Sequence, residues 1–400
     1  IAFQTAWRKH YHPAAFMAAT LSSELADTDK VQLFLQDSIA NGINFLPPDI
    51  NAGGIRFEPV DAKTIRYGLG AIKGTGESAL GAILRAREGA NSSGPFVDLF
   101  DFCRRIDKRT VNRRVIEALI RAGAFDSLDS HRAKLLASVG VALEAAEQAE
   151  RHAMQSGLFD DAGGGTHSPR HVEAAPWSER ERLLNEKQAL GFFLSGHPYH
   201  AYRAELAPFV KKSLAQLEAS PKGTSSGAQR EPALLAGIVV STRTQMTRRG
   251  KMAIVMLDDA TAQVEVMVFN ELWEAERAKI REDELLLVEG KVMRDDFSGG
   301  LRVVADKLLT LGEARGRFAK MLHLAVNGQA DAEKLRSLLA PYRNLGNPGN
   351  GACPVRLSYR NADAEVELGL PDAWRVRLDD ALLAALHEWL SAENVNVVYS

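Results

Sequence analysis

Cysteine is scarce in this 400-residue chain, and the two that occur, Cys103 and Cys353, lie far apart without histidines at metal-ligand spacing. That usage indicates a reducing compartment and argues against a zinc site. No apolar run approaches the roughly twenty residues that a membrane-spanning helix needs. A strong charge of one sign is also lacking, since 49 Lys and Arg against 51 Asp and Glu leave a net charge of −2. Any contact with nucleic acid must therefore come from local basic clusters.

The length and the 46% hydrophobic content exceed what one ordinary core needs, so we expect two to four domains. The chain opens at Ile1, without a methionine or a signal-peptide pattern, and inside a helical pattern. These features predict the C-terminal portion of a larger polypeptide.

The first half of the chain has a helical pattern. Residues 1–45 are predicted to be helical until "LPPDIN" (46–51), with four side chains in the core: Phe3, Trp7, Phe16 and Leu21. Further helices are predicted as two short ones within 94–125, a long one at about 131–154, and a pair between 178 and 210. "SPKGTSSGAQREP" (220–232) has the composition of a flexible linker.

Beyond the linker the hydrophobic pattern alternates. Strands are predicted at 234–246, 252–258, 263–269, 284–294 and 301–311, with a helix near 271–283. Three strands, one helix and two strands form the order of an OB-fold barrel. The last eighty or so residues predict strand, helix, two strands, helix, strand. The fold class is thus multidomain α+β: a helical region, an OB-fold barrel and a small α+β domain.

A glycine hairpin interrupts the stretch "YGLGAIKGTGESALGAILRAR" (67–87), whose pattern is helical on both sides. Glycine lets a backbone approach a phosphate closely, and the N–H groups that begin a helix attract an anion. We therefore expect a sequence-independent DNA contact from the helix-hairpin-helix type of motif, with these residues: Lys73, Gly74, Thr75 and Gly76. An ordinary glycine turn between packed helices is the alternative.

Local charge supports the DNA hypothesis. The segment from Lys63 to Arg121 contains twelve basic residues and six acidic ones. A second stretch of phosphates is expected to meet the cluster Arg104, Arg105, Lys108, Arg109, Arg113 and Arg114, of which the last three are the candidate DNA contacts. A solvated helix face is the alternative for any single one of them.

The predicted barrel offers a single-strand site. Its first loop, "RTQMTRRGK", carries four basic residues, Arg243, Arg248, Arg249 and Lys251, and its last loop, "DDFSGG", offers Phe297 as a stacking ring. The barrel as a whole is not basic, so a protein-binding or purely structural barrel remains an alternative.

Several blocks together resemble one family. "FQTAWRKHYHPAAFMAATLSSELADTDKV", "YGLGAIKGTGESA", "NRRVIEALIRAGAFD", "ALGFFLSGHP" and "DDFSGGLRV" are similar, in order, to segments of the bacterial replicative DNA polymerase III alpha subunit. The resemblance implies the end of the fingers region (1–60), a helix-hairpin-helix and clamp-binding domain (61–165), a helical connector and linker (166–232), an OB-fold domain (233–312) and a C-terminal domain that binds the clamp-loader tau subunit (317–400).

The resemblance also implies what to expect of catalysis and partners. The family's polymerase carboxylates and their Mg²⁺ belong to a palm domain upstream of Ile1, so we expect no catalytic residue, metal site or cofactor here. Three acidic pairs, Asp160–Asp161, Asp258–Asp259 and Asp295–Asp296, fit turns instead. The expected partners are double- and single-stranded DNA, the sliding clamp, tau and, through the missing part, the other core subunits, in the bacterial cytoplasm at the nucleoid and not at a membrane.

"QSGLF" (155–159) resembles the Gln-x-x-Leu-Phe type of clamp-binding peptide. Leu158 and Phe159 would fill an apolar pocket on the clamp, and the Gln155 amide would bond at its rim. The alternative is a helix end at Gly157 on which both apolar side chains pack back.

Two other functions remain as alternatives. A DNA repair nuclease or ligase also combines a helix-hairpin-helix with an OB barrel, although no nucleophilic lysine motif or carboxylate cluster is found. A tRNA-binding accessory module would explain the barrel alone, and leaves the glycine hairpin and "QSGLF" without a role.

Overall fold

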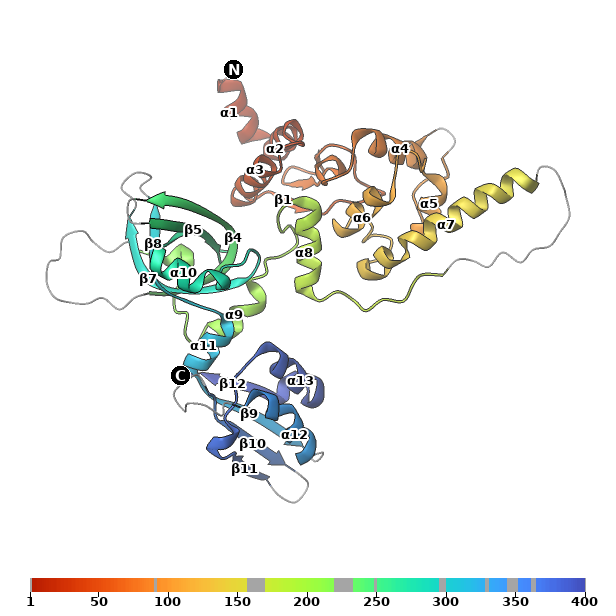
Figure 1. Cartoon of the computed structure of the whole chain (residues 1–400). Coiled ribbons are helices and arrows are strands. Elements are labelled where there is room, and N and C mark those ends of the chain that lie inside the picture. The colour runs from red at the N-terminus through yellow and green to blue at the C-terminus, as the bar shows by residue number, and fades with distance from the viewer. Residues whose placement is uncertain are drawn as a thin grey trace. The chain divides into compact units, whose positions relative to one another are not determined.

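The computed structural model describes residues 2–89, 92–156, 170–218, 233–247, 250–294, 300–327, 331–343, 352–360 and 365–399. They form two compact units, Ile1–His197 and Pro198–Ser400, which are described separately (Figure 1). Within these residues no helix is both long and apolar enough to span a bilayer.

Three helices open the first unit: α1 (Ala2–Tyr11), α2 (Pro13–Ser23) and α3 (Thr28–Ala40). Leu21 is fully buried and Phe16 packs against the core, as predicted. The prediction for Phe3 and Trp7 is wrong, because they are 80% and 46% exposed. No described element covers that face of α1, and the Trp7 ring instead packs on Tyr11 of its own helix, with 5.0 Å between centroids.

A small sheet and five further helices complete this unit around one core. The sheet has the order β1-β3-β2, from β1 (Asn44–Leu46), β2 (Glu58–Pro59) and β3 (Thr64–Arg66). Side-chain caps begin three of the helices, at Asp98, Asn112 and Ser178. The helices are α4 (Glu77–Glu88), α5 (Leu99–Arg105), α6 (Arg113–Arg121), α7 (Arg132–Ser156) and α8 (Glu179–Leu190).

The helix predicted before the glycine hairpin is wrong: a single 3-10 turn, η1 (Leu69–Ala71), follows β3 there. The backbone is bound to the loop after β1 instead of to a helical ladder, since Leu69 N donates to Gly54 O and Gly70 N to Ile55 O, each at 2.9 Å. A Cβ at Gly68 would lie 2.6 Å from the Arg56 carbonyl carbon, so glycine is required for this close approach.

The second unit contains the predicted barrel. Its strands close in the order β4-β5-β6-β8-β7, with β6 and β8 parallel and the other pairs antiparallel. Val264, Val266 and Val268 are buried in its interior, as the alternation indicated. The elements are β4 (Ala233–Thr247), β5 (Gly250–Asp258), β6 (Gln263–Val268), α10 (Asn270–Glu276), η3 (Arg277–Lys279), β7 (Leu285–Arg294) and β8 (Leu301–Leu309). The OB-fold prediction is confirmed.

Two short helices precede the barrel, and α9 packs on its outer face. Tyr199 and Leu206 share a core there with Ile238 and Leu287 of the barrel strands. These helices are α9 (His200–Leu206) and η2 (Leu214–Gln216).

The last part of the second unit is the predicted α+β domain, entered through α11 (Leu311–Phe318). Its four-stranded sheet has the order β11-β10-β9-β12, with β9 and β10 parallel, over a separate core. The order of strands and helices matches the prediction. Its elements are β9 (Ala319–Asn327), α12 (Ala332–Leu339), η4 (Ala340–Tyr342), β10 (Val355–Arg360), β11 (Glu365–Gly369), η5 (Asp372–Trp374), α13 (Asp380–Leu390), η6 (Ala392–Asn394) and β12 (Val395–Tyr399).

Candidate nucleic-acid interface

The glycine hairpin is a turn stabilised by hydrogen bonds within its own segment. Gly74 has a φ of +83°, a left-handed conformation that favours glycine. The Thr75 hydroxyl lies within hydrogen-bond distance of two carbonyls of the preceding turn, Leu69 O at 2.9 Å and Ile72 O at 2.7 Å. The Thr75 side chain therefore positions the turn, and its contact with DNA stays a prediction.

Helices α4 and α8 support the hairpin from behind. Ala79, Leu80 and Ile83 of α4 are buried in the core, as their helical spacing predicts. Lys73 N donates to Ala189 O at 2.8 Å, near the end of α8. A local sequence pattern does not reveal this contact, because α8 lies more than a hundred residues further along the chain.

The outer side of the hairpin is open. Lys73, Gly74 and Gly76 are exposed, and a Cβ at Gly74 would meet no atom within 4 Å. A Cβ at Gly76 would meet only Ser78 Oγ, at 3.9 Å. Gly76 is the N-cap of α4, and no side chain caps it. The first N–H groups of α4 are therefore available to an anion from outside.

Basic side chains gather where α6 begins. Arg109 and Arg114 are exposed and form no ion pair with the residues that the structure describes, while Arg113 Nε pairs with Glu117 Oε1 at 2.7 Å. Arg113 and Arg114 occupy the first turn of α6. Positive charge is unfavourable at a helix N-terminus, so Arg114, which has no ion pair with the described residues, does not serve the stability of α6.

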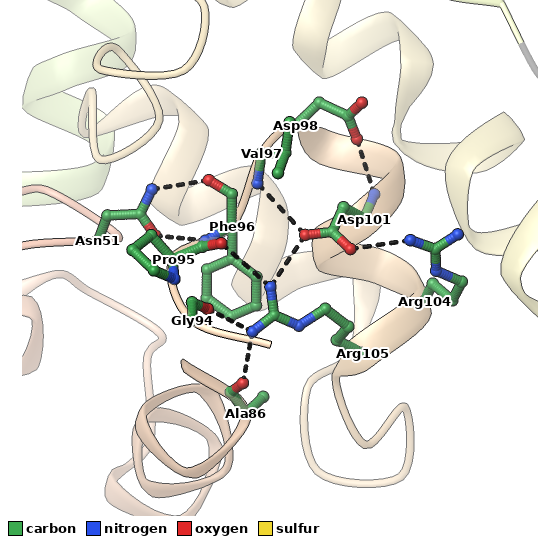
Figure 2. A network of polar contacts seen from close by, with 10 residues as sticks. All are labelled: Asn51, Ala86, Gly94, Pro95, Phe96, Val97, Asp98, Asp101, Arg104 and Arg105. Atoms are coloured by element: carbon green, nitrogen blue, oxygen red, sulfur yellow. Dashed lines mark hydrogen bonds and ion pairs between the residues drawn. The ribbon is translucent and has the colours of Figure 1, made fainter. Parts of the chain in front are cut away.

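Among the other members of this basic cluster, Arg105 is bound within the fold, and the expected phosphate contacts of Arg104, Arg105 and Lys108 stay predictions. Arg105 is half-buried and donates to Ala86 O at 2.7 Å, to Pro95 O at 3.2 Å and to Asp101 Oδ2 at 3.0 Å, with its guanidinium 4.6 Å from the Phe96 ring centroid (Figure 2). Two neighbours form ion pairs, Arg104 with Asp101 and Lys108 with Glu150.

Asp101 is the acidic centre of this network. Its partial burial acts to raise the pKa of the carboxyl, but hydrogen bonds from Arg105 and Arg104 outweigh burial and lower that pKa. Asn51 holds the adjacent segment through two bonds of 2.8 Å with the Phe96 backbone (Figure 2). The network joins α4, α5 and the loop after β1, so it holds in place the helix α4 that follows the hairpin.

In the barrel, Arg243 lies within β4, and its position differs from the loop expected from the sequence. Its guanidinium pairs with Glu265 Oε1 of β6 at 2.6 Å, and Arg302 of β8 pairs with Glu265 Oε2 at 3.1 Å. Lys251 is half-buried, with its Nζ 5.8 Å from the Trp273 ring centroid. Arg248, Arg249 and Phe297 lie outside the described residues.

The clamp motif lies at the end of α7. Gln155 belongs to the last turn of that helix, whose C-terminal half projects from the first unit (Figure 1). The Gln155 side chain, Leu158 and Phe159 lie outside what the structure describes, so their role stays a prediction.

The acidic pair Asp258–Asp259 confirms the turn interpretation. Asp259 Oδ1 accepts hydrogen bonds from Thr261 N at 2.9 Å and Ala262 N at 3.1 Å, as an aspartate does in a turn. The pairs Asp160–Asp161 and Asp295–Asp296 lie outside the described residues. In the part of the chain that is described, no three His, Cys, Asp or Glu side chains are grouped to hold a metal ion.

Three family models match successive parts of the chain. Residues 42–135 match a helix-hairpin-helix motif, and residues 233–311 match an OB-fold nucleic acid binding domain. Residues 334–390 match the C-terminal domain of DNA polymerase III subunit alpha. The fold and these matches define a chain that joins a helix-hairpin-helix region to an OB barrel and a replicase-type C-terminal domain.

Curated relatives over the whole length identify the family. DNA polymerase III subunit alpha of Neisseria meningitidis serogroup A is 43% identical over 99% of this chain and 34% of its own length. The subunits from Vibrio cholerae and Escherichia coli K12 are 38% and 37% identical over 100% of the chain and 34% of theirs. The chain belongs to the family of DNA polymerase III alpha subunits and spans about a third of the length of these relatives.

Among solved structures, a domain of replication protein A from Methanococcus maripaludis is 17% identical to this chain, with a TM-score of 0.20. The match covers 25% of this chain and 93% of the replication protein A domain. That likeness is too slight to support a conclusion about function.

Proposed function

We propose that this chain is the DNA-binding and partner-binding C-terminal part of a replicative DNA polymerase III alpha subunit. The open hairpin Lys73–Gly76 carries the proposal, because its uncapped helix end and its two glycines leave room for a phosphate. The whole protein would then be a DNA-directed DNA polymerase in the bacterial cytoplasm, at the nucleoid. Its carboxylates and Mg²⁺ would lie in the palm domain, outside these residues.

The hairpin would hold duplex DNA without reading its sequence. The N–H groups at the start of α4 would donate to phosphate oxygens, and Lys73, exposed beside them, would add a mobile positive charge. Arg109, Arg113 and Arg114 would contact further phosphates. None of these groups needs to reach a base edge, so we expect equal affinity for different duplex sequences.

The barrel would guide the single-stranded template. Strands β5 and β6 correspond to the face on which OB folds bind oligonucleotides. Arg243 and Arg302 lie on the outer side of that face, since their partner Glu265 alternates with the interior valines of β6. Arg248, Arg249, Lys251 and Phe297 would extend the path through the loops.

Two protein partners complete the proposal. Gln155, Leu158 and Phe159 would bind the sliding clamp as a linear motif that follows α7. Residues 317–400 would bind the clamp-loader tau subunit, which the family match to residues 334–390 supports. The remaining core subunits would bind parts of the protein outside this chain.

Fluorescence anisotropy with two labelled duplexes of unrelated sequence tests the DNA contact. Lys73→Ala should weaken both complexes equally and lower the slope of log K against log salt by about 0.9, the loss of one phosphate contact. Lys63→Ala is a matched control, since Lys63 is also exposed and its side chain forms no ion pair with the described residues. A loss that depends on duplex sequence, or an equal loss in both variants, would overturn the assignment.

A further inference from the structure

A separate basic cluster surrounds a cavity of about 480 Å³ in the second unit. The cavity lies among α9, the segment that follows it, and the turn between β5 and β6. The charged or phenolic side chains that line it are Tyr199, His200, Arg203, Lys211, Lys212 and Asp259. No residue of the hairpin or of the β5–β6 strands contributes a charge to it.

The positive charge of this cavity comes from exposed side chains, two of which form no ion pair within the described chain. His200, Arg203, Lys211 and Lys212 are exposed. Arg203 and Lys212 form no ion pair with any residue that the structure describes, and Lys211 Nζ donates only to the Pro208 carbonyl. Like charges gathered around one cavity repel, so this arrangement does not serve folding and indicates a site for an anion.

Two acids of this region, Asp259 and Glu205, have hydrogen-bond or ion-pair partners of their own. Asp259 is the one carboxylate among the described lining residues, and its oxygens accept from Leu214 N at 2.8 Å and Thr261 Oγ1 at 2.6 Å. Glu205 of α9 pairs with Arg315 Nε at 2.5 Å and accepts from the Tyr399 hydroxyl at 2.6 Å. Asp259 thus joins the segment after α9 to the β5–β6 turn, and Glu205 binds the C-terminal domain.

We propose that this cavity is a phosphate-binding pocket that accepts one nucleotide, either free or as a unit of a DNA single strand. Its volume lies within the range of about 300–1,000 Å³ that is usual for small-molecule sites. Arginine and lysine form their strongest hydrogen bonds with ionised oxygens such as those of phosphate. The pocket is a separate site from the hairpin and from the β5–β6 face of the barrel that carries Arg243 and Arg302.

The test compares Arg203→Ala with Lys212→Ala against a charge-matched control, Lys307→Ala with Arg336→Ala, whose two residues are exposed in the same unit but do not line the pocket. Calorimetric titration with inorganic pyrophosphate measures the pocket alone. Anisotropy with a fluorescent adenine nucleotide and with a labelled oligothymidylate distinguishes the two sources of phosphate. Thermal unfolding of both variants checks that they are folded.

We expect the pocket variant to lose about tenfold or more in affinity for pyrophosphate, since each charge-assisted bond contributes more than about 1.4 kcal/mol. The control should bind like the unchanged chain. If the pocket variant also loses affinity for the adenine nucleotide but not for the oligothymidylate, the site is assigned to free nucleotides. A loss for the oligothymidylate, with competition by pyrophosphate, assigns it to the strand. Equal binding of all probes by both folded variants would overturn the proposal.

Discussion

Arg104 and Arg105 are adjacent in sequence and differ in their surroundings. The Arg104 side chain is 65% exposed and meets one carboxylate, whereas that of Arg105 is 13% exposed and meets three backbone carbonyls as well as Asp101. Charge patterns alone predict the same role for both, since the burial of Arg105 comes from contacts with Ala86, Gly94 and Pro95, which a charge pattern does not contain. A basic cluster in sequence is therefore no measure of a basic surface.

Substitution separates the two arginines. Arg105→Ala should destabilise the first unit by about 2–4 kcal/mol, because three carbonyls, two of them part-buried, lose their donor and Asp101 loses one of its two arginine partners. Arg104→Ala, the matched control, should cost less than about 1 kcal/mol. Scanning calorimetry measures the difference, at about 2–4 °C per kcal/mol for a unit of this size. Similar melting temperatures for the two variants would contradict the structural role of Arg105.

Glu77 is the one feature of the hairpin that opposes a phosphate. It lies in the first turn of α4, where a carboxylate stabilises the helix but repels an anion. We expect Glu77→Gln to raise the affinity for duplex DNA by about two- to fivefold at low salt. Glu333→Gln, in the first turn of α12, is the control. Unchanged or weaker duplex binding by Glu77→Gln would mean that no phosphate approaches this helix end.

At the scale of elements, hydrophobic alternation and the order of strands and helices predict the barrel well, whereas the helix predicted before the glycine hairpin does not form. Every barrel strand lies within a few residues of its predicted bounds. Alternation is complete in β6, whose buried valines alternate with more exposed residues, whereas β4, β5 and β7 each contain a run of consecutive buried residues. The helix predicted before the hairpin is wrong, since the backbone of Leu69 and Gly70 is bound to Gly54 and Ile55 of the loop after β1 and not to a helical ladder. Those are contacts between segments, and a local pattern carries no information about them.

The barrel face gives a prediction from its ion pairs. Glu265 holds Arg243 and Arg302 together, so Glu265→Gln should release both for phosphates. Single-strand affinity should rise, and the salt slope should steepen by up to about 1.4, for two phosphate contacts of about 0.7 each. Glu289→Gln, which releases Arg317 from a pair on β7, is the control. A weaker single-strand complex would indicate that the three residues serve only the barrel.

At the scale of the whole molecule, the proposal assigns a separate partner to each module of the chain. The site residues that sequence alone placed in loops, Arg248, Arg249, Phe297, Leu158 and Phe159, lie outside the described residues, so their roles depend on binding experiments. The hairpin and the barrel strands are described, and for them the geometry supports the proposal directly. The proposed binding of DNA and of protein partners is the property that the hairpin, the barrel and the clamp motif have in common.

The clamp motif is tested at this scale. Leu158→Ala with Phe159→Ala should abolish binding to the sliding clamp while DNA affinity and melting temperature stay almost unchanged. Two apolar anchors, each contributing roughly 1.5–3 kcal/mol when buried in a partner, dominate a short linear interface. Val366→Ala with Leu368→Ala, two exposed apolar residues of β11, is the control in surface plasmon resonance. A melting temperature several degrees lower would instead make "QSGLF" a helix end.

The open end of α4 is the central claim, and Gly76→Ser tests it most directly. Gly76 has φ −73° and ψ 152°, the backbone of an N-cap, where serine is favoured and can accept a hydrogen bond from the first turn. The variant should therefore keep or gain stability while its side chain occupies the place of the phosphate. We predict that duplex affinity, measured by anisotropy, falls about tenfold with an unchanged melting temperature. Full duplex affinity in the folded variant would contradict the account.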